Sequence, residues 1–406
     1  MMGRLSIQAA RGPMPSLKSH FLLRRDIVYL NHGAFGACPR PVFEVYQRWQ
    51  QELERQPVEF LGRRAAELMA EARTRLAAYL ACAPDEVVYF PNPTTALNMV
   101  ARSLPLRPGD EVLATDHEYG ALDRTWRFLC AKAGARYIRQ AIGLPIESAE
   151  AVVEAFWSGV SERTRLVFLS HITSPTALTF PVAEICRRAR QAGLLVIVDG
   201  AHAPGHIPLD LPALGADVYA GACHKWLCAP KGASFLYARR SIQPRLEPLV
   251  VSWGWEAEKP SPSPFVDHHE WQGTRDLAAF LSVPAAIDFQ EQHDWPEVRR
   301  RCHALASRTR RQIIERTGLP PLCPDSDTWF AQMVAARLPE TDVELLQRRL
   351  VEKYRIEVPC LRWNGQPLIR VSFQAYNEPE EAQRLVEGLA ELLPPSSVND
   401  PGRPMY

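Results

Sequence analysis

Between residues 86 and 238, short apolar runs alternate with longer stretches in which apolar residues recur at helical spacing. The short runs predict strands at residues 86–90, 111–114, 165–170, 194–199, 218–220 and 234–238. The longer stretches predict helices at residues 95–103, 119–133, 149–159 and 182–192. Strands that alternate with helices form sheets with both faces covered, so the pattern predicts an α/β fold with a mainly parallel central sheet.

Patterns outside this region predict the rest of the architecture. Residues 41–80 have helical spacing that Pro57 interrupts, so two helices are expected. Residues 241–275 are rich in Pro, Trp and Ser and are expected to form a long loop region. Helical patterns resume at 277–291 and 296–316. The C-terminal part then mixes strand patterns at 329–335 and 368–373 with helical patterns at 342–353 and 379–393, which predicts a smaller α+β domain.

We therefore expect four parts along the chain, with a short extended segment at 26–31 and a turn at 32–36 inside the first. They are an N-terminal arm and substrate-lining segment (1–40), a large domain (41–290), a small C-terminal domain (291–393) and a frayed tail (394–406).

Composition excludes several classes of function. The 406 residues carry 47 Lys and Arg against 46 Asp and Glu, and no basic stripe is visible, so a nucleic-acid partner is not expected. No apolar run is long enough to span a membrane, and the N-terminus lacks the apolar core of a secretion signal. The nine cysteines form no CxxC pair and no zinc spacing. We expect a cytoplasmic protein with buried thiols and no metal site.

Two segments carry the strongest chemical signal. The apolar run 194–198 ends in Asp199, and about twenty-five residues later Lys225 follows another short run among small residues. The carboxyl ends of strands line the ligand crevice of open α/β sheets. Asp199 alone is equally consistent with a turn cap, and Lys225 alone with a surface lysine. Together they supply what pyridoxal phosphate (PLP) needs, namely an amine for its aldehyde carbon and a carboxylate for its pyridine nitrogen.

A third segment, residues 91–98, follows the strand at 86–90 and opens a helix. Free backbone N–H groups at a helix start, with the hydroxyls of Thr94 and Thr95, are suited to bind a phosphate. Ordinary N-capping by Thr94 is the alternative explanation, and both can hold together.

These segments together resemble the class V aminotransferase superfamily of fold-type I PLP-dependent enzymes, and most of all its isopenicillin N epimerase-like branch. The resemblance implies a fold-type I transferase with a seven-stranded central sheet, and a homodimer with PLP sites near the interface. The residues that carry it are Asn31-His32-Gly33 with Phe35-Gly36, 94–98, 116–121, 199–202, His224-Lys225, 273–276, 370–372 and Tyr376-Asn377.

The resemblance also implies roles for single residues. Lys225 would hold the cofactor covalently and later move a proton at the substrate's Cα, and Asp199 would pair with the pyridine nitrogen. His202 would lie near the ring hydroxyl, and His117, or alternatively Tyr119, would stack on the ring. The phosphate would be held by Thr94, Thr95, His224 and, across the dimer interface, Thr274. Arg370 would clamp the substrate carboxylate, and Asn31, His32 and Arg275 would line the substrate pocket.

The reaction itself stays open at this stage. Epimerisation, loss of a β-substituent and transamination share the same first half, and the resemblance favours epimerase or C–S lyase activity on an amino-acid substrate. A cysteine desulfurase that uses Cys360 as sulfur acceptor is the alternative, although desulfurases carry an asparagine where this chain has Ser174. A non-catalytic PLP-fold binding protein is the third hypothesis. Specificity would depend on the 241–275 region, where Trp253, Trp255, Phe265 and Trp271 are candidate wall residues or, more commonly, packing residues.

Overall fold

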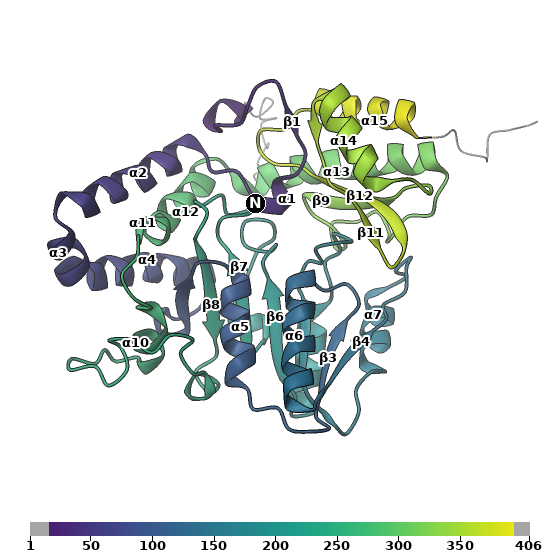
Figure 1. Ribbon diagram of the computed structural model, residues 1–406. Coiled ribbons are helices and arrows are strands. Elements are labelled where there is room, and N and C mark those ends of the chain that lie inside the picture. Colours follow the sequence, from purple (N-terminus) through teal and green to yellow (C-terminus); the bar gives the residue numbers. More distant parts are fainter. Residues whose placement is uncertain (1–15, 394–406) are drawn as a thin grey trace, which may run out of the picture.

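The central feature of the computed structural model, which describes residues 16–393, is a seven-stranded sheet with the order β2-β8-β7-β6-β5-β3-β4 (Figure 1). Its strands are β2 (Val87–Phe90), β3 (Glu111–Thr115), β4 (Arg136–Gln140), β5 (Thr164–Ser170), β6 (Leu195–Gly200), β7 (Val218–Ala222) and β8 (Ser234–Ala238). The pairs from β7 to β4 are parallel, and β8 is antiparallel to both of its neighbours. The expected α/β fold with a mainly parallel sheet is confirmed.

Helices cover both faces of this sheet, and alternate strand residues belong to two separate cores. Phe168 and Ile197 pack with α5 (Pro93–Ser103) and α6 (Gly120–Ala133). Val167 and Val198 belong to the opposite core, with residues of the helices on the other face. The helices of that second core include α4 (Ala65–Tyr79), α7 (Ala149–Trp157), α8 (Val182–Gln191), α12 (Val283–Gln292) and α13 (Trp295–Thr317). Burial of both faces explains the near-continuous apolar runs of the strands.

A smaller C-terminal domain lies beyond the carboxyl edge of the sheet (Figure 1). It has an antiparallel sheet of the order β11-β12-β9, flanked by α13, α14 (Val343–Tyr354) and α15 (Pro379–Leu392). The strands are β9 (Met333–Arg337), β11 (Cys360–Trp363) and β12 (Gln366–Ser372).

The N-terminal segment is joined to this small domain. β1 (Val28–Tyr29) pairs in parallel with β10 (Ile356–Glu357), and the Ser372 amide donates to the Leu30 carbonyl. This contact was not predicted, because nothing local in the first forty residues indicates a partner more than three hundred positions away.

Several local predictions are corrected. β4 was missed because it is an edge strand with polar, half-exposed residues. The turn expected at 32–36 is a short helix, α1 (His32–Phe35), ended by Gly36 at φ 68°, where a Cβ would lie 2.0 Å from the His224 carbonyl oxygen. The 241–275 loop region contains α10 (Pro264–Glu270), capped by Ser263.

Other elements match the expectation more closely. Pro57 does separate α2 (Arg40–Arg55) from the helices that follow, α3 (Pro57–Glu59), a π-helical turn (Phe60–Arg64) and α4. Short helices α9 (Leu211–Leu214) and α11 (Ala278–Leu281) complete the chain. Within residues 16–393, no helix is long and apolar enough to cross a membrane. The tail predicted at 394–406 and the first fifteen residues of the arm lie outside the described residues.

Candidate active site

A cavity of about 340 Å³ lies at the carboxyl edge of the central sheet. β6 ends in Asp199 and Gly200, and the neighbouring β7 ends three residues before Lys225. Side chains from six separated segments meet here: Ala34, Phe35, Asn92, Pro93, Thr94, Tyr119, Ser170, Ile172, Ser174, Asp199, Ala201, His202, His224 and Lys225. The structure therefore brings Lys225 and Asp199 to one cavity, as the sequence predicted.

Asp199 provides a buried carboxylate, with only 4% of its surface exposed. Its Oδ1 accepts the Ala201 amide at 2.9 Å, which orients the group. Burial raises the pKa of Asp199, and the Ala201 amide and the charge of Lys225 partly oppose that rise. A carboxylate in this position is stabilised by a cation, as a protonated pyridine nitrogen would be.

Lys225 has an amine with an unusually low proton affinity. Burial, followed by the nearby charge of Arg370, lowers its pKa from 10.5 to about 8, while Asp199 acts in the opposite direction. At pH 7 about a tenth of the amine is therefore unprotonated and nucleophilic, several hundred times more than at the ordinary pKa. Such a shift is typical of lysines that attack carbonyl carbons.

His202 is held in one tautomer by its neighbours. The indole Nε1–H of the buried Trp226 donates to His202 Nδ1 at 3.2 Å, and burial lowers the pKa of His202 well below its ordinary value. A neutral imidazole that accepts at Nδ1 carries its proton on Nε2. Nε2 lies 3.3 Å from Lys225 Nζ, so this N–H faces the amine across the cavity wall.

The start of α5 is arranged differently from the expectation. Asn92, not Thr94, is the N-cap, and its Oδ1 accepts both the amide and the hydroxyl of Thr95. Thr95 is thereby engaged within the cap and does not line the cavity, whereas Thr94 does. The N-cap differs from the predicted one because Pro93 is the first residue of the helix, so Asn92 takes the capping position just before it.

His224 also lines the cavity, and its Nδ1 donates to the Ala233 carbonyl at 3.1 Å. Burial lowers the pKa of His224 to about 4, and an anion beside the ring would raise it again. Thr94, the α5 N-terminus and His224 thus present hydrogen-bond donors that are suited to a phosphate.

His117, expected to stack on the ring, does not line the cavity. His117 is fully buried, with Nδ1 2.7 Å from Thr176 Oγ1 and Nε2 3.0 Å from the Ile142 carbonyl oxygen. Tyr119, the alternative, lines the cavity and is 45% exposed. The two residues are only two positions apart in a turn, and their side chains point in different directions, which the sequence pattern could not resolve.

Arg370, the residue predicted to bind the substrate carboxylate, lies close to the cavity but does not line it. Arg370 is buried on β12, and its Nη1 donates to the carbonyl oxygen of Ser174 at 2.6 Å and to Ser174 Oγ at 3.2 Å. Ser174 lines the cavity, and the Arg370 Nε has no protein partner. Arg370 therefore lies directly behind the cavity wall with unused donor capacity.

The other predicted substrate residues do not reach the cavity within one chain. His32 lies between the Tyr376 hydroxyl and the Lys225 carbonyl, at 3.0 Å from each. Asn31 donates to Glu357, and Arg275 covers the Phe280 ring with its guanidinium carbon 4.6 Å from the centroid. Thr274 is exposed to solvent. His32 supports the Lys225 backbone rather than touching the cavity.

Sequence reasoning missed two polar residues, one that lines the cavity and one buried behind it. Ser170, at the end of β5, lines the cavity, and its hydroxyl donates to Glu118 at 2.6 Å. Burial raises the pKa of Glu118 to about 8, more than its hydrogen bonds lower it. The signal was present, since Glu118 follows His117 in a motif already noted, but its burial depends on the tertiary fold. No cluster of metal-ligating side chains occurs among residues 16–393.

Known proteins similar to this chain agree with the geometry. The sequence model of the family described as aminotransferase class-V matches residues 28–385. Isopenicillin N epimerase from Amycolatopsis lactamdurans is 39% identical over 380 residues, with 90% of this chain and 95% of that protein covered. A probable chloroplastic L-cysteine desulfhydrase from Arabidopsis thaliana is 28% identical, with 91% and 83% covered.

Solved structures show the same fold. The apo cysteine desulfurase from Thermococcus onnurineus NA1 superposes with a TM-score of 0.80 at 21% identity, over 94% of this chain and 99% of that one. At that identity the likeness concerns the fold alone. With the family match over most of its length and a cavity that joins Lys225 to Asp199, the chain belongs to the aminotransferase class-V family of PLP-dependent enzymes.

Proposed function

We propose that this protein binds PLP at the cavity of Lys225 and Asp199 and epimerises an amino-acid substrate at its α-carbon, as an isopenicillin N epimerase-like enzyme. The observation that carries the proposal is one cavity with a low-pKa amine, a buried carboxylate and a helix N-terminus. These three features fit the aldehyde, the pyridine nitrogen and the phosphate of PLP. The 39% identical epimerase supports the choice of reaction.

When bound, PLP supplies an electron sink that stabilises negative charge at the substrate's α-carbon. Lys225 Nζ, unprotonated above its lowered pKa, removes the α-proton from the face of the substrate that it meets. A proton delivered to the opposite face of the α-carbon then gives inversion. The Asp199 carboxylate keeps the pyridine nitrogen protonated, and His202 Nε2–H orients the Lys225 amine. Arg370 attracts the substrate carboxylate and, with its positive charge, keeps the Lys225 pKa low.

The test is to incubate the PLP-loaded protein in D₂O with isopenicillin N and with a panel of L- and D-amino acids. Exchange of the α-proton together with inversion of configuration supports the proposal. Pyruvate and sulfide from cysteine, without inversion, would assign the protein instead to C–S lyases, the activity named for the 28% identical desulfhydrase. Absence of a protein-bound absorption band after PLP is added and the unbound excess is removed would contradict both.

The Cys360 thiol is poorly placed for the desulfurase alternative. It is 8% exposed at the start of β11, burial raises its pKa to about 12, and it does not line the cavity with Lys225. Sulfur transfer needs an accessible thiolate. We therefore expect Cys360→Ala to leave α-proton exchange, and any release of alanine from cysteine, within about twofold of the wild-type rates, a change of well under 1 kcal/mol. Alanine formation by the wild type that is lost in this variant, with PLP binding intact, would restore the desulfurase interpretation.

PLP capture by the apoprotein should depend on pH. Only the neutral amine attacks an aldehyde, and the Lys225 pKa of about 8 lies below the ordinary 10.5. The rate constant for capture, measured by absorbance, is expected to rise about tenfold per pH unit below pH 8 and to level off above it. In Arg370→Met the plateau should move to higher pH, because the positive charge that lowers the lysine pKa is gone. An unchanged profile in this variant would contradict the proposed coupling.

Trp226 is expected to act as a positioning residue through His202. Trp226→Phe removes the donor to Nδ1, so His202 is free to adopt either tautomer, and kcat should fall about three- to tenfold, the value of one hydrogen bond. Nitrogen-15 NMR of the histidines should show His202 changing from the Nε2–H form to a mixture. Trp295→Phe is the control, since it removes a buried indole bond to the Gly205 carbonyl without touching His202. Equal losses in both variants would indicate a packing effect only.

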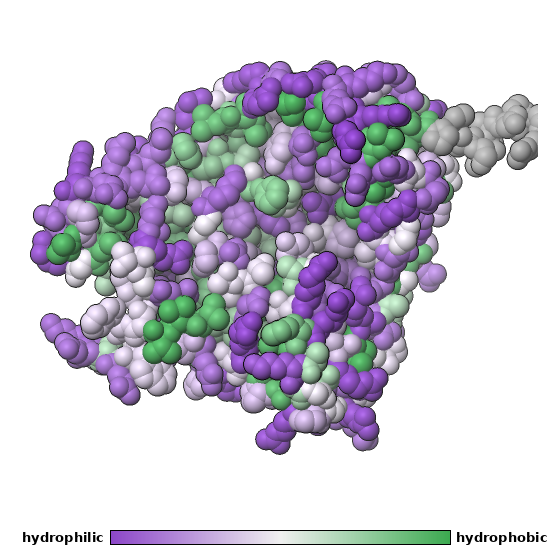
Figure 2. Space-filling view, in the orientation of Figure 1, coloured by the Kyte–Doolittle hydropathy of each residue, from purple (hydrophilic) through white to green (hydrophobic). Residues whose placement is uncertain are grey.

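The proposal includes a homodimer in a reducing cytoplasm. All nine cysteines are free thiols. Thr274 is exposed and away from its own chain's cavity, as expected of a residue that serves a partner's phosphate site. Hydrophobic surface lies beside α10 in Figure 2, and Val251, Trp253 and Trp255 in the preceding loop are exposed, Trp253 by 85%. Light scattering of the PLP-loaded protein tests the dimer.

A further inference from the structure

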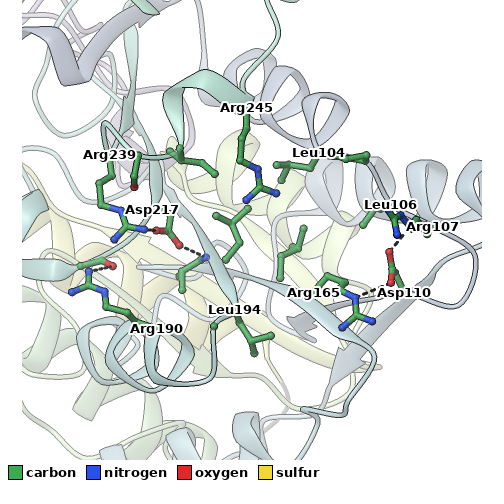
Figure 3. Close-up of a pocket in the computed structure, with 18 residues that line it drawn as sticks. Leu104, Leu106, Arg107, Asp110, Arg165, Arg190, Leu194, Asp217, Arg239 and Arg245 are labelled. Atoms are coloured by element: carbon green, nitrogen blue, oxygen red, sulfur yellow. Dashed lines mark hydrogen bonds and ion pairs between the residues drawn. The ribbon is translucent and has the colours of Figure 1, made fainter.

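A second cavity, of about 610 Å³, lies at the opposite edge of the central sheet (Figure 3). Leu195 and Val196 at the start of β6 line it, whereas Asp199 at the end of the same strand lines the first cavity. Asp199 lies four positions after Leu195, which is about 13 Å along the strand. Its volume falls within the range of small-molecule sites.

Arginines dominate the polar lining of this second cavity. Five of them, against two aspartates, surround it: Arg107, Arg165, Arg190, Arg239 and Arg245. They come from separate elements, namely the loop before β3, the start of β5, the end of α8, the end of β8 and the turn after it. The fold thus concentrates an excess of positive charge that is not apparent in the nearly neutral chain as a whole.

The two aspartates are already engaged. Asp110 binds Arg165 Nε at 2.9 Å and the Arg107 amide at 2.8 Å. Asp217 pairs with Arg239 and accepts the Val196 amide at 2.8 Å. Both carboxylates therefore neutralise one arginine each and fix the strand ends, which leaves three guanidinium groups without a carboxylate partner.

The three remaining arginines have guanidinium N–H groups that no protein group in the described part of the chain accepts. Arg190 donates only to the Gly215 carbonyl, and the Arg107 and Arg245 guanidinium groups make no hydrogen bond or ion pair with residues 16–393. Figure 3 shows Arg245 extending into the hollow. The Arg239 Nε is buried without a partner as well. Guanidinium groups so placed repel one another and are suited to bind an oxyanion through paired N–H donors.

Apolar side chains complete the lining, with Leu166, Ile242 and Leu104 buried at its base and Leu106 and Leu194 beside them. A purely inorganic anion would leave this surface uncovered. We infer that the second cavity is a binding site for an organic phosphate, whose apolar body covers the leucines and whose dianionic group lies among Arg107, Arg190 and Arg245.

The experiment uses the PLP-loaded protein, so that the first cavity is filled, and phenyl phosphate as the probe in calorimetry at low ionic strength. One phenyl phosphate is expected to bind per chain without a change in the visible PLP band. Inorganic phosphate lacks the apolar ring and benzyl alcohol lacks the phosphate group, so each should bind at least tenfold more weakly than phenyl phosphate. Added salt should weaken the binding of phenyl phosphate.

Two variants test the assignment of residues. Arg245→Gln and Arg107→Gln change exposed side chains with no protein partner, so folding should be unaffected, and each should weaken phenyl phosphate binding at least fivefold. Arg349→Gln, which removes an exposed charge on α14, is the matched control and should have no effect. Absence of binding, equal binding by the wild type and the Arg245 variant, or displacement of PLP by the probe would overturn the inference.

Discussion

Replacing Lys225 by alanine is expected to lower kcat for α-proton exchange by roughly 10³- to 10⁴-fold, the upper range for loss of a general base. The variant also loses the covalent link to the cofactor, so its visible absorption band should shift to that of free PLP. The side chain is the cavity's only amine, and the low pKa that makes it nucleophilic comes from burial and Arg370. The measurement combines absorption spectra with deuterium exchange in D₂O.

Two controls separate this chemistry from a packing effect. Lys231→Ala removes the next lysine in the sequence, whose Nζ donates to the Gly36 carbonyl outside the cavity, and should retain the PLP band and most of the activity. Methylamine added to Lys225→Ala should restore part of the exchange rate, because it returns an amine to the vacated space. A Lys225→Ala protein that keeps more than a tenth of the wild-type rate would refute the proposed role.

Asp199→Asn is expected to give the second largest loss, on the order of 10²- to 10³-fold in kcat, comparable to the loss of one preorganised electrostatic group. The amide keeps the size of the side chain and an oxygen for the Ala201 N–H, so the fold should be preserved. What disappears is the negative charge that keeps the pyridine nitrogen protonated, and with it the ring's capacity to accept electrons.

The control variant for Asp199→Asn is Asp116→Asn. Asp116 is a part-buried aspartate outside the cavity, and its Oδ1 accepts the Ile142 amide. This variant should change thermal stability slightly and kcat within a factor of about two. If Asp199→Asn bound PLP and turned over at the wild-type rate, the carboxylate would have no role at the ring.

The sequence predicts those features of the fold and the site that leave a pattern in neighbouring residues. The buried strands were found because both faces are apolar, whereas β4, with Arg136, Arg139 and Gln140, resembles a loop in composition. Asp199 and Lys225 were found because each follows a strand, and strand ends meet at one edge of a parallel sheet.

Side-chain direction and long-range contacts lie beyond such patterns. The choice between His117 and Tyr119 depends on the backbone of a single turn, and the capping role of Asn92 depends on where the helix begins. The pKa of Glu118 is set by burial beneath Ser170, and the grouping of Arg107, Arg190 and Arg245 by three elements that only the folded chain brings together. None of these has a signature in neighbouring residues.

The parallel pair of β1 and β10 has a consequence for how the protein is made. Val28 pairs with Ile356, so the first strand to leave the ribosome must wait for about 330 further residues. At 5–20 residues per second, that delay is roughly 15 to 65 s, during which the nascent strand has an unsatisfied edge. Synthesis rate and chaperone supply should therefore influence the yield of active enzyme.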